Sequence, residues 1–147
     1  MMFFKIESEE FWQKIENNVK ETGLEGGVYR LHCLKDPEGD EVIPIQRCMG
    51  EDNEGILYIG KANQFLNRVI DLKKSLLPNY KTKSHVCGLR YNNDAHANFR
   101  DAFPIERLCV TLVSDQNPKR MEEELLFKYC KKFGETPPLN SLEQANI

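Results

Sequence analysis

The 147-residue sequence has no apolar run that approaches the ~20 residues a helix needs to cross a membrane. We also expect no secretory leader, because the apolar start over residues 1–4 is too short and acidic residues follow it closely. These absences exclude a membrane-spanning or exported protein, and we expect a cytoplasmic protein that makes no use of a membrane.

Cysteine is present in a pattern that argues against two of its common uses. The five cysteines are an odd number at wide spacings, and no two of them form a Cys-x-x-Cys pair. This arrangement is unlike a disulfide framework and unlike a structural zinc site. Unpaired cysteines are mostly small buried hydrophobic side chains, and we expect that role here.

The chain has no overall excess of basic residues. Its net charge is −3, whereas a domain that binds nucleic acid is usually basic. The charges are unevenly spread, because residues 61–90 carry seven Lys or Arg and only one acidic residue. This basic middle fits a local phosphate-binding surface, and it fits a solvated lysine-rich helix and loop equally well.

Patterning predicts one small layered domain over residues 1–147, since the chain shows no repeat and no linker. Apolar periodicity predicts helices over 9–22, 64–76 and 118–133, and a short helix ending near 103. β-rich runs predict strands over 28–34, 56–60 and 108–113, and a short extra strand over 42–46. We interpret the polar stretch 78–98 as a long loop. The resulting fold class is α/β (α+β), with a central three-stranded sheet flanked by helices.

Two tripeptides and three single residues follow one another in a distinctive order. Gly27-Val28-Tyr29 and Tyr58-Ile59-Gly60 lie on predicted strands, and Arg68 follows eight residues after Gly60. Glu122 lies three residues before Leu125 on a predicted helix, and Asn140 follows Pro138-Leu139. In this order the chain resembles the GIY-YIG nuclease superfamily over residues 27–140.

The resemblance implies a three-stranded sheet flanked by helices and cleavage of a phosphodiester bond with a single divalent cation, Mg²⁺ or Mn²⁺. It leaves residues 1–24 as an extra N-terminal helix and residues 35–54 as an insertion that enlarges the hairpin. It implies the following catalytic residues, among which Glu122 is the metal ligand: Tyr29, Tyr58, Lys61, Arg68, Glu122 and Asn140.

One departure concerns proton transfer. The family often has a histidine four residues after the arginine, and this chain has Leu72 there. Either His85 or Lys61 could substitute, or no substitute is needed.

The chemistry of these side chains suits phosphodiester cleavage, which requires an activated nucleophile and neutralisation of charge at phosphorus. If the two strands pair in register, Tyr29 and Tyr58 lie over one site, because alternate residues of a strand share a face. A tyrosine has a pKa of about 10, so a phenolate would need cations such as Lys61 and Arg68 nearby. The alternative is that both tyrosines are core aromatics.

Arg68 and Glu122 each have a structural alternative. A guanidinium fork matches a phosphate, yet Arg68 could instead pair with Asp71 at the helix surface. Glu122 lies over the apolar face of its helix, and a single carboxylate suits magnesium, which keeps several waters. The alternatives are that Glu122 merely favours the helix N-terminus, or that Glu123 holds the metal. Asn140 fixes local backbone or orients the site.

Basic and aromatic residues in and before the 78–98 stretch predict contacts with a nucleic-acid backbone and with bases. The candidate nucleic-acid-binding residues are Lys73, Lys81, Lys83, His85 and Arg90. A mobile surface loop is the alternative, and for His85 alone an exposed loop histidine is the favoured one.

The sequence therefore predicts a metal-dependent endonuclease that acts on double-stranded or branched DNA. The alternatives are a catalytically impaired nucleic-acid-binding module with the same fold, and a protein-interaction domain with an exposed apolar patch in residues 35–54. Specificity would come from the insertion, the 78–98 stretch, a homodimer or a partner subunit.

Overall fold

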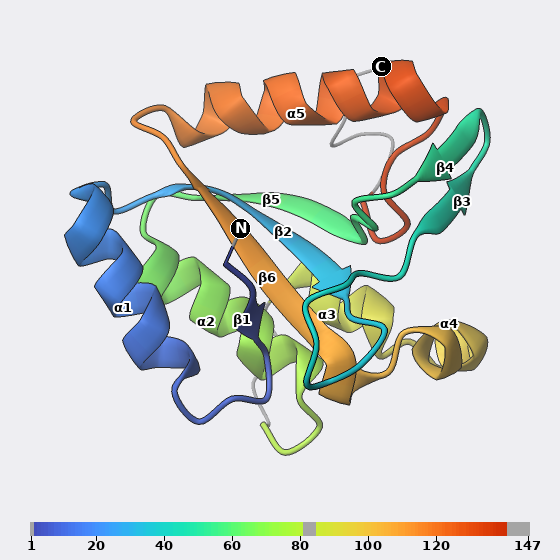
Figure 1. The fold of residues 1–147 in the computed structure, drawn as a ribbon, viewed down its shortest axis with the longest axis horizontal. Helices are drawn as coiled ribbons and strands as arrows, with labels where there is room; N and C mark the ends of the chain where they lie inside the picture. Colours follow the sequence, from blue (N-terminus) through green and yellow to red (C-terminus); the bar gives the residue numbers. More distant parts are fainter. Residues whose placement is uncertain (1, 81–84, 141–147) are drawn as a thin grey trace.

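The computed structural model describes residues 2–80 and 85–140, in which a four-stranded antiparallel sheet has the order β1-β6-β2-β5 (Figure 1). Its strands are β1 (Phe4–Lys5), β2 (Gly27–Cys33), β5 (Tyr58–Ala62) and β6 (Leu108–Ser114). A separate two-stranded sheet consists of β3 (Ile45–Arg47) and β4 (Gly50–Asp52). The domain is therefore mixed α+β.

Helices cover both faces of the larger sheet. Helix α5 (Pro118–Phe133) crosses one face, and α1 (Phe11–Thr22), α2 (Phe65–Leu76) and α3 (Val86–Tyr91) lie on the other (Figure 1). The short α4 (Ala97–Ala102) lies at the periphery, between the 3-10 turns Asp94–His96 and Ile105–Arg107. Because strand residues alternate in direction, each face has its own apolar cluster.

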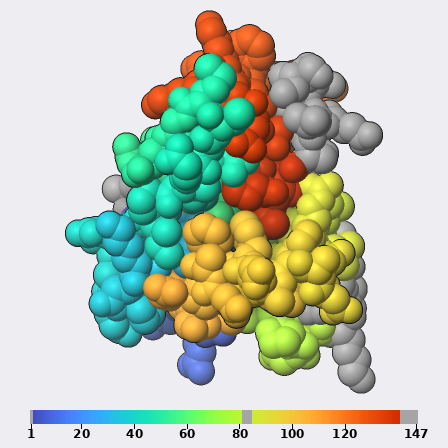
Figure 2. Space-filling model, turned by 90° about the vertical axis from the view of Figure 1, so that its right-hand side faces the viewer, coloured from blue at the N-terminus to red at the C-terminus, as the bar shows by residue number. Residues whose placement is uncertain are grey.

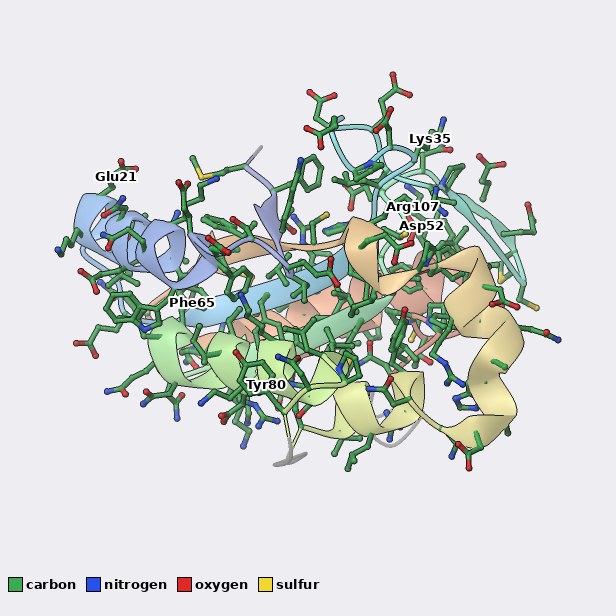
Figure 3. All side chains as sticks on the ribbon, turned by 90° about the horizontal axis from the view of Figure 1, so that it is seen from below. Glu21, Lys35, Asp52, Phe65, Tyr80 and Arg107 are labelled. Atoms are coloured by element: carbon green, nitrogen blue, oxygen red, sulfur yellow. The ribbon has the colours of Figure 1, made fainter. Side chains whose placement is uncertain are left out.

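The two clusters show which side chains face which helices. Val28 and Ile59 pack with Leu126 beneath α5. Tyr29 lies on the opposite face, in the cluster that Phe65 of α2 joins. Figure 3 shows Phe65 in the layer between α1 and α2, where its side chain is fully buried.

The insertion over residues 35–54 forms the β3–β4 hairpin and docks against the end of α5 (Figure 2). The Met49 amide donates to the Phe133 carbonyl at 2.9 Å, and Arg47 pairs with Glu135 at 2.7 Å. Asp52, which is buried, accepts a hydrogen bond from the Tyr129 hydroxyl at 2.9 Å. The insertion is thus joined to the domain by polar contacts and by Ile45, which belongs to the apolar cluster on the α2 side of the sheet.

Two predictions about the fold were wrong. The sheet has four strands instead of three, because Phe4 and Lys5 pair with Val110 and Cys109 of β6. The stretch 78–98 contains α3, the whole 3-10 turn Asp94–His96 and the start of α4 instead of a long loop. A helix forms there because the residues that α3 turns toward α2 are buried, among them Cys87 and Tyr91.

Across residues 2–80 and 85–140, no helix combines the length and the apolar character needed to span a membrane.

Candidate functional site

A cleft of about 580 Å³ lies beside β5, the last strand of the larger sheet, and takes its walls from both helical layers. It brings together five of the six predicted catalytic residues from four separate elements: Tyr29 of β2, Tyr58 and Lys61 of β5, Arg68 of α2 and Glu122 of α5. Its remaining lining residues are Ala62, Asn63, Gln64, Asn67 and Asp71.

The strand register places both tyrosines on one face of the sheet. Tyr29 is opposite Gly60, and Leu31 is opposite Tyr58. The two phenol rings lie with their centroids 6.1 Å apart, and both side chains are almost completely buried. The two tyrosines therefore lie on one face of the sheet, as predicted. They are core residues and they also line the cleft.

Gly60 is required where it stands because the Tyr29 side chain occupies the space above it. A Cβ atom added to Gly60 would lie 2.5 Å from both Cζ and Oη of Tyr29, and 2.7 Å from Cε2 of Tyr58. Such distances are far inside van der Waals contact. The glycine that ends the second tripeptide therefore makes room for the two tyrosines.

His85 contacts Tyr29 directly. Its Nε2 atom lies 2.5 Å from the Tyr29 hydroxyl oxygen, and its ring packs edge-on against both tyrosine rings. The imidazole is fully buried, and burial together with the nearby Arg68 lowers the pKa of His85 to about 3. The interpretation of His85 as an exposed loop histidine, available to contact nucleic acid, is therefore wrong.

The residue four positions after Arg68 is a leucine, and it is a core residue. Leu72 is completely buried in the apolar cluster on the α2 side of the sheet. The imidazole near Tyr29 belongs instead to His85, the N-cap residue of α3, which lies 13 positions after Leu72 in the sequence. Of the two substitutes considered for the usual histidine, His85 is the one in contact with Tyr29.

Burial dominates the ionisation of the two candidate reactive groups. It raises the pKa of Tyr29 well above its usual value, and Tyr58 raises it further, while the charge and hydrogen bond of Arg68 oppose the rise. Burial also raises the pKa of Glu122. Lys61 opposes that rise through its charge and its main-chain amide, which donates to the carboxylate.

Glu122 is the carboxylate that α5 directs into the cleft. It is partly buried and lines the cleft, whereas Glu123 is exposed and does not. No cluster of three or more His, Cys, Asp or Glu able to hold a metal occurs among residues 2–80 and 85–140. One carboxylate fits a magnesium ion that keeps several waters and takes further ligands from a phosphate.

Asn140 does not line the cleft, although it was predicted as a catalytic residue. Its side-chain oxygen accepts from the Ile59 amide, and its side-chain nitrogen donates to the Ile59 carbonyl, both at 2.9 Å. The Leu139 amide donates to Leu57 on the same strand edge. Asn140 thus holds the edge of β5 between Tyr58 and Gly60, which agrees with its alternative role of fixing local backbone.

Two predicted nucleic-acid-binding residues make contacts inside the domain. The Lys73 ammonium donates to the Ser8 carbonyl at 2.9 Å and lies over the Phe11 ring, so it joins α2 to α1. Arg90 donates to the Leu139 carbonyl at 2.6 Å. These internal contacts do not support the predicted role of Lys73 and Arg90 in binding nucleic acid. The prediction used residue type, which does not tell which way a side chain points. Lys81 and Lys83 lie outside the described residues.

Sequence reasoning missed the polar residues at the start of α2 that line the cleft, namely Asn63, Gln64, Asn67 and Asp71. A signal was available, since positions 64, 67, 68 and 71 recur at helical spacing on the face opposite the apolar stripe. In the described part of the chain no ion pair joins Arg68 to Asp71, so the surface-pair alternative for Arg68 is not observed.

Comparison of the chain with models of known families, with curated proteins and with solved structures finds no match.

Proposed function

We propose that this chain is a metal-dependent endonuclease of the GIY-YIG type that hydrolyses phosphodiester bonds in double-stranded or branched DNA in the cytoplasm. One observation carries the proposal: two tyrosines, a lysine, an arginine and a glutamate from four elements line a single cleft. The motif order in the sequence supports the same function.

Arg68 and Lys61 supply the positive charge that a phosphate requires. Arg68 lines the cleft without an ion pair to its neighbour Asp71, and its planar fork matches two phosphate oxygens at once. Lys61 lies beside Glu122 and is exposed. Both cations act where charge develops on the phosphate during cleavage.

Glu122 is the residue that would hold the divalent cation. When bound, Mg²⁺ or Mn²⁺ supplies Lewis-acid polarisation of a phosphate oxygen and stabilises the departing oxygen. The carboxylate has the donor chemistry that magnesium prefers, and the opening of the cleft leaves room for water and substrate oxygens.

Tyr29 and Tyr58 present phenol groups to the same cleft. An ordinary tyrosine is already protonated near neutral pH, and burial raises the pKa of Tyr29 further, so its hydroxyl in the DNA-free protein is a hydrogen-bond donor. For Tyr29 to act as a base, cations bound together with DNA must add positive charge near its hydroxyl. Tyr58 lies beside it and completes the wall of the cleft.

Recognition of DNA falls to the rim of the cleft, since Lys73, His85 and Arg90 have internal contacts. Asn63, Gln64 and Asn67 at the start of α2 offer amide groups that can donate to and accept from bases or phosphates. A homodimer or a partner subunit would add further contacts.

The test is a cleavage assay on purified protein with supercoiled plasmid and with flapped or branched DNA, in magnesium or manganese against EDTA. The proposal predicts cleavage that requires the cation and falls about 100-fold or more in Tyr29→Phe, since general acid–base groups contribute on that scale. Tyr80→Phe, an exposed tyrosine outside the cleft, is the control and should cleave normally.

The alternative function is a catalytically impaired module that binds nucleic acid with the same fold. Tight, salt-sensitive binding without cleavage of any substrate would favour it, because phosphate contacts release counterions. The contact between His85 and Tyr29 weighs against this alternative, since it gives a candidate catalytic hydroxyl a buried hydrogen-bond partner.

A further inference from the structure

The protonation state of His85 is fixed by a main-chain amide. The Cys87 N–H donates to the His85 Nδ1 atom at 3.1 Å, as part of the cap of α3. A backbone amide can only donate, so Nδ1 must keep its lone pair. A neutral imidazole with an unprotonated Nδ1 carries its single proton on Nε2.

His85 is neutral in the folded protein near neutral pH. Its side chain is fully buried, and both burial and the Arg68 charge lower its pKa. Its Nε2–H therefore points at the only partner within reach of that nitrogen in the described residues, the Tyr29 oxygen at 2.5 Å. Tyr29 accepts this hydrogen bond.

The Arg68 cation is near the same phenol, since it opposes the rise in the pKa of Tyr29. With the His85 N–H directed at the oxygen and a cation nearby, the Tyr29 proton cannot lie on the His85 side. It points toward the cleft that Tyr29 lines. We infer that His85 is a positioning residue whose Nε2–H donates to Tyr29 and turns the Tyr29 hydroxyl proton into the cleft.

The ring of His85 is held firmly enough for this role. The His85 amide donates to the Ser75 hydroxyl of α2 at 2.9 Å. Gly88 allows α3 to approach, since a Cβ atom at Gly88 would lie 2.2 Å from the Ser75 Cβ. Helix α2 also carries Arg68, so one unit positions both the His85 donor and the Arg68 cation near Tyr29.

This arrangement assigns a direction to the proton of Tyr29. A His85 that accepted the Tyr29 proton would need a free Nε2 lone pair and a proton on Nδ1, and the Cys87 amide excludes that tautomer. His85 therefore does not act as a base toward Tyr29. If Tyr29 ionises when DNA and cation are bound, the His85 N–H and the Arg68 charge stabilise the phenolate.

The inference rests on the proposed function only for its effect on cleavage, so the first measurement does not use DNA. Nitrogen-15 NMR of the full chain with labelled histidine distinguishes protonated from unprotonated ring nitrogens. We expect His85 to show an unprotonated Nδ1 and a protonated Nε2 at neutral pH, with the assignment made by comparison with His85→Asn. A proton on Nδ1 would overturn the inference, whether or not the protein cuts DNA.

Two variants separate the cap from the donor. In His85→Asn the side-chain oxygen replaces Nδ1 as acceptor for the Cys87 amide but cannot reach Tyr29. In His85→Gln the longer amide reaches Tyr29 as a donor and loses the cap. We expect cleavage to fall about 10- to 100-fold in His85→Asn, the range for residues that orient a ligand through a hydrogen bond.

His85→Gln should cleave faster than His85→Asn although it melts at a lower temperature, a pattern that a purely structural role for His85 does not produce. Equal cleavage rates in the two variants would overturn the inference. Absence of cleavage by the wild-type chain would contradict the proposed function alone, since the tautomer would still be read by NMR.

Discussion

Tyr29 and Gly60 are opposite each other on β2 and β5, and the Tyr29 phenol fills the space where a side chain at position 60 would lie. The contact joins the two tripeptides of the sequence motif, Gly27-Val28-Tyr29 and Tyr58-Ile59-Gly60. It also explains their composition, because the glycine of one tripeptide accommodates the tyrosine of the other.

The first prediction concerns this contact. Gly60→Ala should displace Tyr29, because the new methyl group would lie 2.5 Å from its ring and hydroxyl. We expect a loss of about 1–3 kcal/mol in unfolding free energy, typical of overpacking, and loss of cleavage. Urea denaturation and the plasmid assay measure the two effects. Gly39→Ala, where the nearest atom would lie at 3.5 Å, is the matched control and should change neither.

The second prediction concerns Arg68. Arg68→Ala should reduce cleavage by about 10²–10³-fold, as for the loss of a donor to a transition-state oxyanion. Arg68→Lys keeps the charge without the fork and should recover only part of the rate. Single-turnover cleavage measures both variants. Lys74→Ala on the same helix is the control, since Lys74 is exposed and outside the cleft; an equal loss there would indicate general electrostatics.

The third prediction concerns Asn140. Asn140→Ala leaves the Ile59 amide and carbonyl without their side-chain partners, and a buried unpaired group costs about 1–3 kcal/mol. We expect lower stability and weaker cleavage, because Tyr58 and Gly60 flank Ile59. Asn93→Ala, which removes a side-chain bond to an exposed turn, serves as control. A stable Asn140→Ala protein with full activity would show that β5 needs no such support.

The fourth prediction concerns pH. The pKa of His85 is lowered to about 3 in the folded chain, against about 6.5 in an unfolded one. The folded state therefore binds this proton less readily, so the contribution of His85 to stability is complete above pH 6.5. It is lost as the pH falls toward 3.

Between pH 7 and pH 4, wild type should lose on the order of 3 kcal/mol more unfolding free energy than His85→Asn. Denaturant titrations of both proteins at several pH values measure this difference. His32, whose pKa is lowered to about 4 by burial, is present in both proteins and affects them alike. Parallel curves for the two proteins would rule out a buried neutral His85.

The parts of the site that were predictable lie on regular elements. The family resemblance indicated Tyr29, Tyr58 and Arg68, and strand alternation predicted that the two tyrosines share a face of the sheet. The choice of Glu122 over Glu123 followed from the apolar face of α5. The three predicted strands are present and adjacent in the larger sheet.

The parts that were not predictable depend on tertiary packing. Helix α3 spans six residues, too few for a periodic pattern, and forms by packing on α2. Its cap carries His85 into the core next to Tyr29. Lys73 and Arg90 were assigned to a basic surface from charge alone, and both turn toward neighbouring segments of the chain.

We propose that Glu122 holds the divalent cation with which the cleft cleaves DNA. The most direct measurement is cleavage of supercoiled plasmid as a function of magnesium concentration for wild type, Glu122→Gln and Glu123→Gln. Glutamine keeps the size of the side chain and removes its charge, and Glu123 is the exposed neighbour outside the cleft. The account predicts loss of magnesium-dependent cleavage in Glu122→Gln and a wild-type response in Glu123→Gln. Wild-type cleavage by Glu122→Gln would contradict it.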